Sequence, residues 1–171
     1  MSDFCNYSAG FMIDKNITIS FKQYDSLDEL TAEQRKLLDE AYKAMSNAYA
    51  PYSNFHVGAS LMDQDGNIFI GANMENAAFP MCICAEGSLL ASYSSSGAKS
   101  PIVQVAVTAS SANQLLDSPV APCGACRQML SEFENKQGSP ITIILKGSSG
   151  PIHVMNSVKD ILPFGFSSES L

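Results

Sequence analysis

Two short segments that lie far apart in the chain together carry three cysteines and one glutamate. The first is Cys84-Ala85-Glu86, and the second is Pro122-Cys123-Gly124-Ala125-Cys126-Arg127. Thiolates are common zinc ligands, and three protein ligands with one open position are typical of a catalytic zinc site. A fold that brings these thiols to one ion must place two distant parts of the chain side by side. We predict that Cys84, Cys123 and Cys126 bind a zinc ion.

Each of these segments stands at the start of a predicted helix. Unpaired N–H groups at a helix N-terminus favour thiolate over thiol, and Cys123 and Cys126 share one helical face. A purely structural zinc site normally has a fourth protein ligand, but His56 and His153, the two histidines, both fall in strand-like patterns. Cys82 could compete as a ligand, and we favour a small packed side chain for it instead.

Composition places the chain among globular proteins. Its 171 residues suit one domain, with 46% hydrophobic and 16% charged residues. The formal net charge of −7 argues against a nucleic-acid partner, because phosphate binding relies on clustered lysine and arginine. No apolar run is long enough to span a bilayer and the start does not resemble a secretory signal, so we expect no membrane partner. Five cysteines, three of them at metal spacing, indicate a reduced, cytoplasmic protein.

Hydrophobic periodicity and the order of the expected elements predict an α/β fold, in which helices pack on the faces of one mixed sheet. We expect an N-terminal extension over residues 1–28, partly loose with a possible short strand, and a single domain over residues 29–171. The last two strands should be antiparallel, because only residues 146–151 connect them. The expected strands are 17–21 (the possible short one), 55–62, 68–72, 102–108, 141–145 and 152–154, and the expected helices are 31–47, 84–97, one beginning near Pro122, and 158–162.

The charge of a three-thiolate zinc site needs an explanation. Three thiolates on a divalent ion leave a net charge of −1, which opposes ionisation of a water molecule on the metal. Arg127, next to Cys126, is the candidate charge-compensating residue. The alternative for Arg127 is an ordinary solvated charge on the helix surface.

The order Cys-x-Glu followed by Pro-Cys-x-x-Cys is a known signature of zinc deaminases that act on nucleobases. Beyond it, the chain resembles the small three-cysteine cytidine deaminases of free-nucleoside pyrimidine salvage. The resemblance implies a three-layer α/β/α sandwich with a mixed five-stranded sheet, one Zn²⁺ per subunit and a homotetramer, with a homodimer as the alternative. It also implies hydrolysis of cytidine and 2′-deoxycytidine to uridine and 2′-deoxyuridine with release of ammonia. The matching motifs are Tyr49–Phe55, Val57–Ala59, Asn73–Ala78, Cys84–Glu86, Pro122–Gln128, Leu162-Pro163 and Phe166-Ser167.

The resemblance also assigns roles to individual residues. Glu86 would be the catalytic group that takes a proton from water, delivers it to ring N3 and then protonates the leaving amine. Substrate contacts would fall on Phe55, Asn73, Glu75 and the backbone of Ala85, while Phe166 of a neighbouring subunit would help to close the pocket. From the residues alone, Asn73 and Glu75 also fit a strand-end turn, and Phe55 also fits the core.

One position departs from the family pattern. Three-thiolate members usually place an arginine directly after Cys-Ala-Glu, and this chain has Gly87. This departure leaves open a deaminase of a modified cytosine nucleoside, such as blasticidin S. A polynucleotide deaminase and a non-catalytic zinc-binding scaffold are further alternatives, the first opposed by the acidic charge and the second by Glu86.

Overall fold

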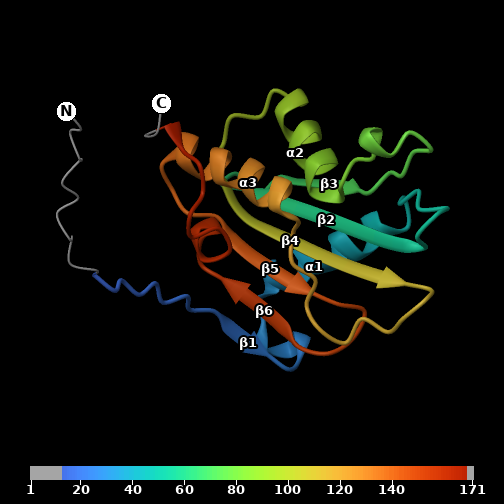
Figure 1. Cartoon of the computed structure of the whole chain (residues 1–171), viewed down its shortest axis with the longest axis horizontal. Coiled ribbons are helices and arrows are strands. Elements are labelled where there is room, and N and C mark those ends of the chain that lie inside the picture. Colours follow the sequence, from blue (N-terminus) through green and yellow to red (C-terminus); the bar gives the residue numbers. More distant parts are fainter. Residues whose placement is uncertain (1–12, 169–171) are drawn as a thin grey trace, which may run out of the picture.

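The computed structural model describes residues 13–168, in which three α-helices pack on a six-stranded mixed sheet (Figure 1). Within this range, no helix combines the length and the apolar character that crossing a bilayer requires. Short 3₁₀ turns occupy Leu27–Glu29, Phe79–Met81 and Val158–Asp160. The strands and helices are β1 (Lys22–Tyr24), α1 (Ala32–Met45), β2 (Phe55–Asp63), β3 (Ile68–Ala72), α2 (Ala85–Ser95), β4 (Ile102–Ser111), α3 (Gly124–Gln137), β5 (Thr142–Lys146) and β6 (Ile152–Met155).

The strand order across the sheet is β1-β6-β5-β4-β2-β3. Only β4 and β5 are parallel, and α3 provides the long crossover that a parallel pair requires. β5 and β6 are antiparallel neighbours, so the prediction for the last two strands is confirmed. β2 and β3, which correspond to the strands expected over 55–62 and 68–72, form an antiparallel hairpin that turns at Gly66 with a φ of 82°.

The prediction of a five-stranded sheet is wrong, because β1 adds a sixth strand at the edge beside β6. The short strand expected over residues 17–21 is also misplaced, since β1 begins only at Lys22. The register explains the shift. Lys22 lies opposite Val154, so Met155, the last residue of β6, is the only residue left to face Phe21. Earlier residues have no strand to pair with, whatever their alternation.

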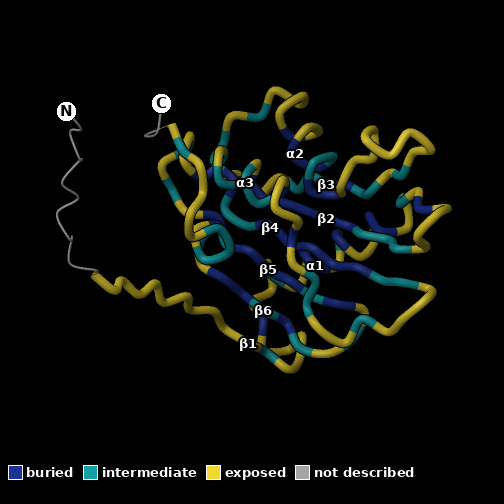
Figure 2. Tube along the Cα trace, viewed as in Figure 1, coloured by how far each residue is buried: buried dark blue, intermediate teal, exposed yellow. Residues whose placement is uncertain are grey.

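The helices cover opposite faces of the sheet, which gives the predicted three layers. Leu37, Leu38 and Ala41 of α1 pack with Ala106 and Ile144 on one face. On the other face, Leu89, Leu90 and Tyr93 of α2 and Leu130 of α3 pack with Val105, Val107, Ile143 and Leu145. Neighbouring residues of β4 and β5 thus enter opposite cores, as expected for strands covered on both sides. Figure 2 shows the resulting band of buried residues along the central strands.

The helix starts follow local capping chemistry. The side chains of Thr31 and Gln34 form a capping box at the start of α1, where the expected helix over 31–47 begins. Cys84 and Cys123 are themselves the N-cap residues of α2 and α3. Pro122 lies just before the N-cap of α3, so this helix begins near Pro122 as expected. The first turns of α2 and α3 therefore directly follow a cysteine in each case.

Two glycines set how closely the helices approach the hairpin. A Cβ atom at Gly58 of β2 would overlap the backbone of Ala41 in α1. A Cβ atom at Gly71 of β3 would overlap the backbone of Ala85 and Leu89 in α2. Because Ala85 belongs to the first turn of α2, the contact at Gly71 fixes where that helix begins relative to the sheet.

We predict that Gly58→Ala and Gly71→Ala each destabilise the protein, because the added methyl group must push a helix backbone away from the sheet. The expected loss in the free energy of unfolding is about 1–3 kcal/mol each, as for other overpacked sites. Chemical denaturation monitored by circular dichroism measures it. Gly87→Ala is the matched control, since its Cβ atom would meet only Ile83 and Met129 at ordinary distances of 3.7 and 4.0 Å. In a helix interior that control should be neutral or slightly stabilising, and equal losses in all three variants would contradict the argument.

Candidate active site

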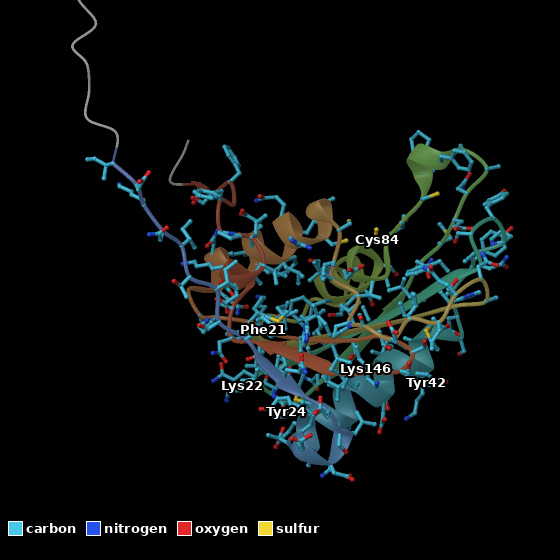
Figure 3. All side chains as sticks on the ribbon, turned by 60° about the horizontal axis from the view of Figure 1, so that its bottom comes forward. Phe21, Lys22, Tyr24, Tyr42, Cys84 and Lys146 are labelled. Atoms are coloured by element: carbon cyan, nitrogen blue, oxygen red, sulfur yellow. The ribbon has the colours of Figure 1, made fainter. Side chains whose placement is uncertain are left out.

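The N-termini of α2 and α3 meet, and this meeting brings three sulfur atoms together. The Sγ atoms of Cys84, Cys123 and Cys126 all lie within 4.8 Å of one another. The Cys84 and Cys123 sulfurs are 3.8 Å apart. Figure 3 labels Cys84 where the chain enters α2. Cys82 is not in this group, and Cys5 lies outside the described residues.

The spacing and donor type fit a zinc ion. Four ligands at the usual Zn–S distance of about 2.3 Å and at tetrahedral angles lie about 3.8 Å apart, which is the separation of the Cys84 and Cys123 sulfurs. Three sulfurs occupy three such corners, and no histidine or carboxylate of the described residues joins them. The set could therefore hold a metal ion and leave one position open.

The pKa values of the three thiols in the cluster are shifted in different directions. Hydrogen bonds from the backbone N–H groups of Cys126 and Ala125, in the first turn of α3, lower the pKa of the Cys123 thiol. Burial raises the pKa of Cys84 and, more strongly, that of Cys126. Three thiolates in contact repel one another, so this arrangement is unfavourable for full ionisation without a cation. A divalent ion at the centre removes that obstacle.

Glu86 lies in the first turn of α2 with only 5% of its surface exposed. Burial raises the pKa of its carboxyl group, while hydrogen bonds with the Glu86 backbone and the Cys126 thiol partly oppose the rise. Glu86, Cys84 and Cys123 line the same cavity of about 440 Å³. A buried acid of raised pKa beside a metal-binding cluster is suited to proton transfer.

The β2–β3 hairpin and the residues that follow it also contribute to the wall of this cavity. Phe55, Asn73 and Glu75 all line the cavity. The Asn73 side chain accepts a hydrogen bond from Val57 N (2.8 Å) and donates one to Phe55 O (2.9 Å). It therefore ties the end of β3 to the start of β2 and has one N–H left to offer a ligand.

Glu75 is held by the loop before β2. Its Oε2 atom accepts hydrogen bonds from Tyr52 N at 2.8 Å and Ser53 N at 3.3 Å. The Ser53 hydroxyl, followed by these backbone donors, holds the pKa of the Glu75 carboxyl below its ordinary value. The cavity thus carries an oriented carboxylate of lowered pKa in addition to the buried Glu86.

Three further residues of interest occupy different surroundings. Ala85 lines the cavity with its backbone at the start of α2. Phe166 is 58% exposed and does not line the cavity of its own subunit. Arg127 donates from Nε to Pro122 O (2.7 Å) and from Nη1 to Ile161 O (3.0 Å), so its hydrogen bonds go to backbone carbonyls, with none to a cysteine sulfur among the described residues.

The structure also shows wall residues that the sequence analysis did not assign. Cys82 is exposed and lines the cavity, with its sulfur accepting a hydrogen bond from Asn76 N at 3.3 Å, so it is not the packed side chain we favoured. Val120 and Ala121, from the irregular segment between β4 and α3, complete the wall. No periodic signal marks such loop residues, and their closeness to Cys123 was the only available hint.

Comparisons with known proteins agree with this geometry. Residues 31–138 match the family described as "Cytidine and deoxycytidylate deaminase zinc-binding region". A cytidine deaminase of Sporosarcina psychrophila is 42% identical over 80% of this chain and 93% of its own length. A cytidine deaminase of Halalkalibacterium halodurans is 36% identical over 81% of this chain and 98% of its own length.

This chain is also similar to solved structures of cytidine deaminases. The crystal structure of cytidine deaminase from Burkholderia pseudomallei superposes with a TM-score of 0.68 at 38% identity, covering 80% of this chain and all of that one. The Mycobacterium tuberculosis enzyme gives a TM-score of 0.61 at 28% identity, covering 80% and 99%. With the three-sulfur cluster and the buried glutamate beside it, these matches show that the chain belongs to the cytidine deaminase family and is a hydrolytic deaminase with a zinc-binding region.

Proposed function

We propose that this protein hydrolyses free cytidine and 2′-deoxycytidine to uridine and 2′-deoxyuridine, releasing ammonia. The observation that carries the proposal is the position of Glu86, which is buried and lines a cavity of about 440 Å³ together with Cys84 and Cys123, two of the three sulfur donors that could hold a metal ion. The names of the relatives and the oriented Glu75 carboxylate in the cavity wall support a substrate with a sugar. The proposed setting is pyrimidine salvage in the cytoplasm, where thiols stay reduced.

Cys84, Cys123 and Cys126 would hold one zinc ion per subunit. When bound, the ion would supply Lewis-acid activation of a water molecule near neutral pH. Glu86 would take a proton from that water and pass it to N3 of the cytosine ring. The water oxygen would bond to C4, and Glu86 would then take the second proton from the new C4 hydroxyl group and deliver it to the amine, so that the C4–N4 bond breaks, ammonia leaves and C4 becomes a carbonyl. One carboxyl group can serve as base and then as acid because burial moves its pKa toward neutrality.

The sugar would bind at the other end of the cavity. Glu75 accepts hydrogen bonds from ribose hydroxyls in this proposal, Asn73 donates its free N–H, and Phe55 offers a ring face. The backbone of Ala85 would meet the oxygen side of the base. Glu75 and Asn73 are already anchored by backbone hydrogen bonds, so binding need not order them first.

Charge compensation at the thiolates is proposed to come from two sources. The N-termini of α2 and α3 both point at the cluster and carry partial positive charge. Arg127 adds a full positive charge one residue from Cys126, acting through space because its hydrogen bonds go to Pro122 and Ile161. The net charge of −7 supports a small neutral nucleoside over a nucleic-acid strand.

We propose a homotetramer in which a neighbouring subunit closes the cavity, with a homodimer as the alternative. Phe166 is exposed, and two hydrogen bonds between its backbone and the Gln128 side chain (2.8 and 3.2 Å) hold it in place. An exposed but anchored aromatic residue is suited to contact with the cavity of another subunit. Exposed apolar side chains surround the cavity, which supports burial of this face in an assembly. They are Tyr49, Tyr52, Met74, Phe79, Met81 and Ile83.

A second candidate is deamination of a modified cytosine nucleoside such as blasticidin S. Gly87, in the position where family members usually have an arginine, favours it. Side-by-side assays of cytidine, deoxycytidine and blasticidin S at equal concentration separate the two. A preference for blasticidin S by kcat/KM would replace the first proposal with the second.

The main test is ultraviolet-monitored conversion of cytidine by the purified protein and by Glu86→Gln. We expect the variant to lose at least about 100- to 10,000-fold in kcat, because the amide cannot shuttle protons. Its bound zinc, measured by elemental analysis, should stay at one ion per subunit, since Glu86 is not in the sulfur cluster. Turnover that survives in Glu86→Gln would favour a non-catalytic role for this carboxylate, and chelator-insensitive turnover would exclude zinc.

Glu75→Gln should raise KM for cytidine by about 10- to 100-fold, the cost of losing a charged hydrogen bond, with a smaller change in kcat. Because the pKa of Glu75 lies below its ordinary value, the carboxylate stays ionised above about pH 5, so its contribution to KM should be constant from there to about pH 8. Steady-state kinetics at several pH values measure both effects. Glu132→Gln, an exposed change on α3, is the control. An unchanged KM in Glu75→Gln would remove this residue from the sugar site.

Gly87→Arg should slow zinc loss to a chelator by about tenfold, because a new cation near thiolates is worth on the order of 1–2 kcal/mol at an intermediate dielectric. The position has room, since its Cβ atom would make only ordinary contacts with Ile83 and Met129. Gly87→Gln is the control of similar bulk without the charge. If glutamine slows zinc loss as much as arginine does, packing and not charge explains the effect.

A further inference from the structure

The segment before β1 is an extended arm, which we define as residues 13–21. It lies outside residues 31–138, which match the family. It has no regular secondary structure, and every one of its residues is exposed. Figure 1 shows it running away from β1, and Figure 2 shows it exposed along its length. The catalytic proposal gives this arm no role.

The arm exposes large apolar side chains. Ile13, Ile17, Ile19 and Phe21 are 76%, 55%, 48% and 53% exposed. In an extended chain, alternate residues share a face, so these four odd-numbered residues point the same way, and Lys15 lies in the same row between Ile13 and Ile17. The centroid of the Phe21 ring lies 4.6 Å from that of the His153 ring of β6, with the two ring planes tilted by 46°. This contact places the apolar face of the arm on the side of the sheet that carries α3. An apolar row of this kind favours burial against another surface.

Other residues of the same subunit cover the apolar face of the arm only in part. Ile17 and Ile19 line one side of a groove of about 490 Å³, and Leu162, Pro163 and Gly165 of the C-terminal segment line another. The groove stays open, and both isoleucines remain about half exposed beside it. A further partner is needed to complete their burial.

The backbone edge is open as well. β1 is the outermost strand and pairs only with β6, so its outer edge has no partner within residues 13–168. The arm prolongs that edge, and Figure 3 marks the junction with Phe21, Lys22 and Tyr24. An unpaired extended edge with apolar side chains is a template for strand addition by another chain.

We propose that the arm docks on a second copy of this chain by antiparallel pairing of the two arms about a twofold axis. The charges of the segment are self-complementary in such a pair. Placing Asp14 of each copy opposite Lys22 of the other also places Ile17 opposite Ile19, with Thr18 on the axis. Opposite residues of paired strands share a face, so the ion pairs lie on one face and the isoleucines on the other. The interface is isologous and closes on itself.

Other occupants fit the arm less well. An anionic membrane surface or a nucleic acid would need a basic patch, and this chain has a net charge of −7 with Asp14 beside Lys15 in the arm itself. The polar even-numbered face and the opposite charges at the two ends match an identical segment running the other way. The inference does not depend on catalysis, and it adds a contact to whatever assembly the active-site face forms.

The experiment is sedimentation velocity of the full chain over a range of concentrations. Ile17→Asp/Ile19→Asp should shift the dissociation of the assembly to at least about tenfold higher concentration, because it places four carboxylates at the axis. Asp14→Lys and Lys22→Asp alone should each weaken association by about tenfold, and the exchanged pair Asp14→Lys/Lys22→Asp should restore it. Lys36→Asp, a charge reversal on the exposed face of α1, is the matched control and should change nothing.

The outcomes separate cleanly. Unchanged dissociation in the double isoleucine variant, or single charge variants that the exchanged pair does not rescue, would overturn the arm pairing. Binding of the wild-type protein to anionic vesicles or single-stranded nucleic acid that is lost in the double isoleucine variant would overturn the arm pairing in favour of those partners. Cytidine turnover is a separate readout, so an intact assembly with no activity would count against the proposed function and leave the arm pairing standing.

Discussion

The structure depends on the meeting of two helix N-termini over the centre of the sheet. α2 begins at Cys84 and α3 begins at Cys123, and each first turn presents unpaired N–H groups to the same small volume. The partial positive charges of the two helix N-termini repel one another, and so do the thiolates, but the helix ends attract the thiolates. A cation held by the three sulfurs would offset the repulsion that remains between them. The close contact of Gly71 with α2 sets the position of one of these helix ends. The parallel crossover from β4 to β5 sets the other.

α3 connects this centre to the end of the chain. Glu134, buried near the C-terminal end of α3, accepts hydrogen bonds from Ile141 N, Val158 N and the Ser157 hydroxyl (2.8, 2.9 and 2.6 Å). Arg127 and Gln128, in the same helix, hold Ile161 and Phe166. The helix that carries two of the three sulfurs therefore also positions the C-terminal segment. A loss of order at one end of α3 would therefore disturb the residues that the other end of the helix positions.

Much of this was predictable because local rules and tertiary packing agree. The Thr31 capping box, the hairpin at Gly66 and the apolar runs of β4 and β5 each carry a strong local signal, and the structure follows them. The strand expected over residues 17–21 failed for a tertiary reason. Its alternation is genuine, but β6 is too short to pair with it. The prediction of a packed side chain for Cys82 was also wrong, because the exposure of this residue depends on which segment packs over it.

The sequence by itself determined the chemical types at the site: three thiols at helix starts, one glutamate two residues after the first thiol, and a chain able to bury a sheet on both faces. Those are properties of composition and short spacing. Only the tertiary structure decided that the sulfurs lie within 4.8 Å of one another, that Glu86 is buried beside them, and that the Arg127 hydrogen bonds go to carbonyls and not to sulfur. Distances between residues 39 or more positions apart depend on how helices pack across a sheet, and no local pattern records that packing.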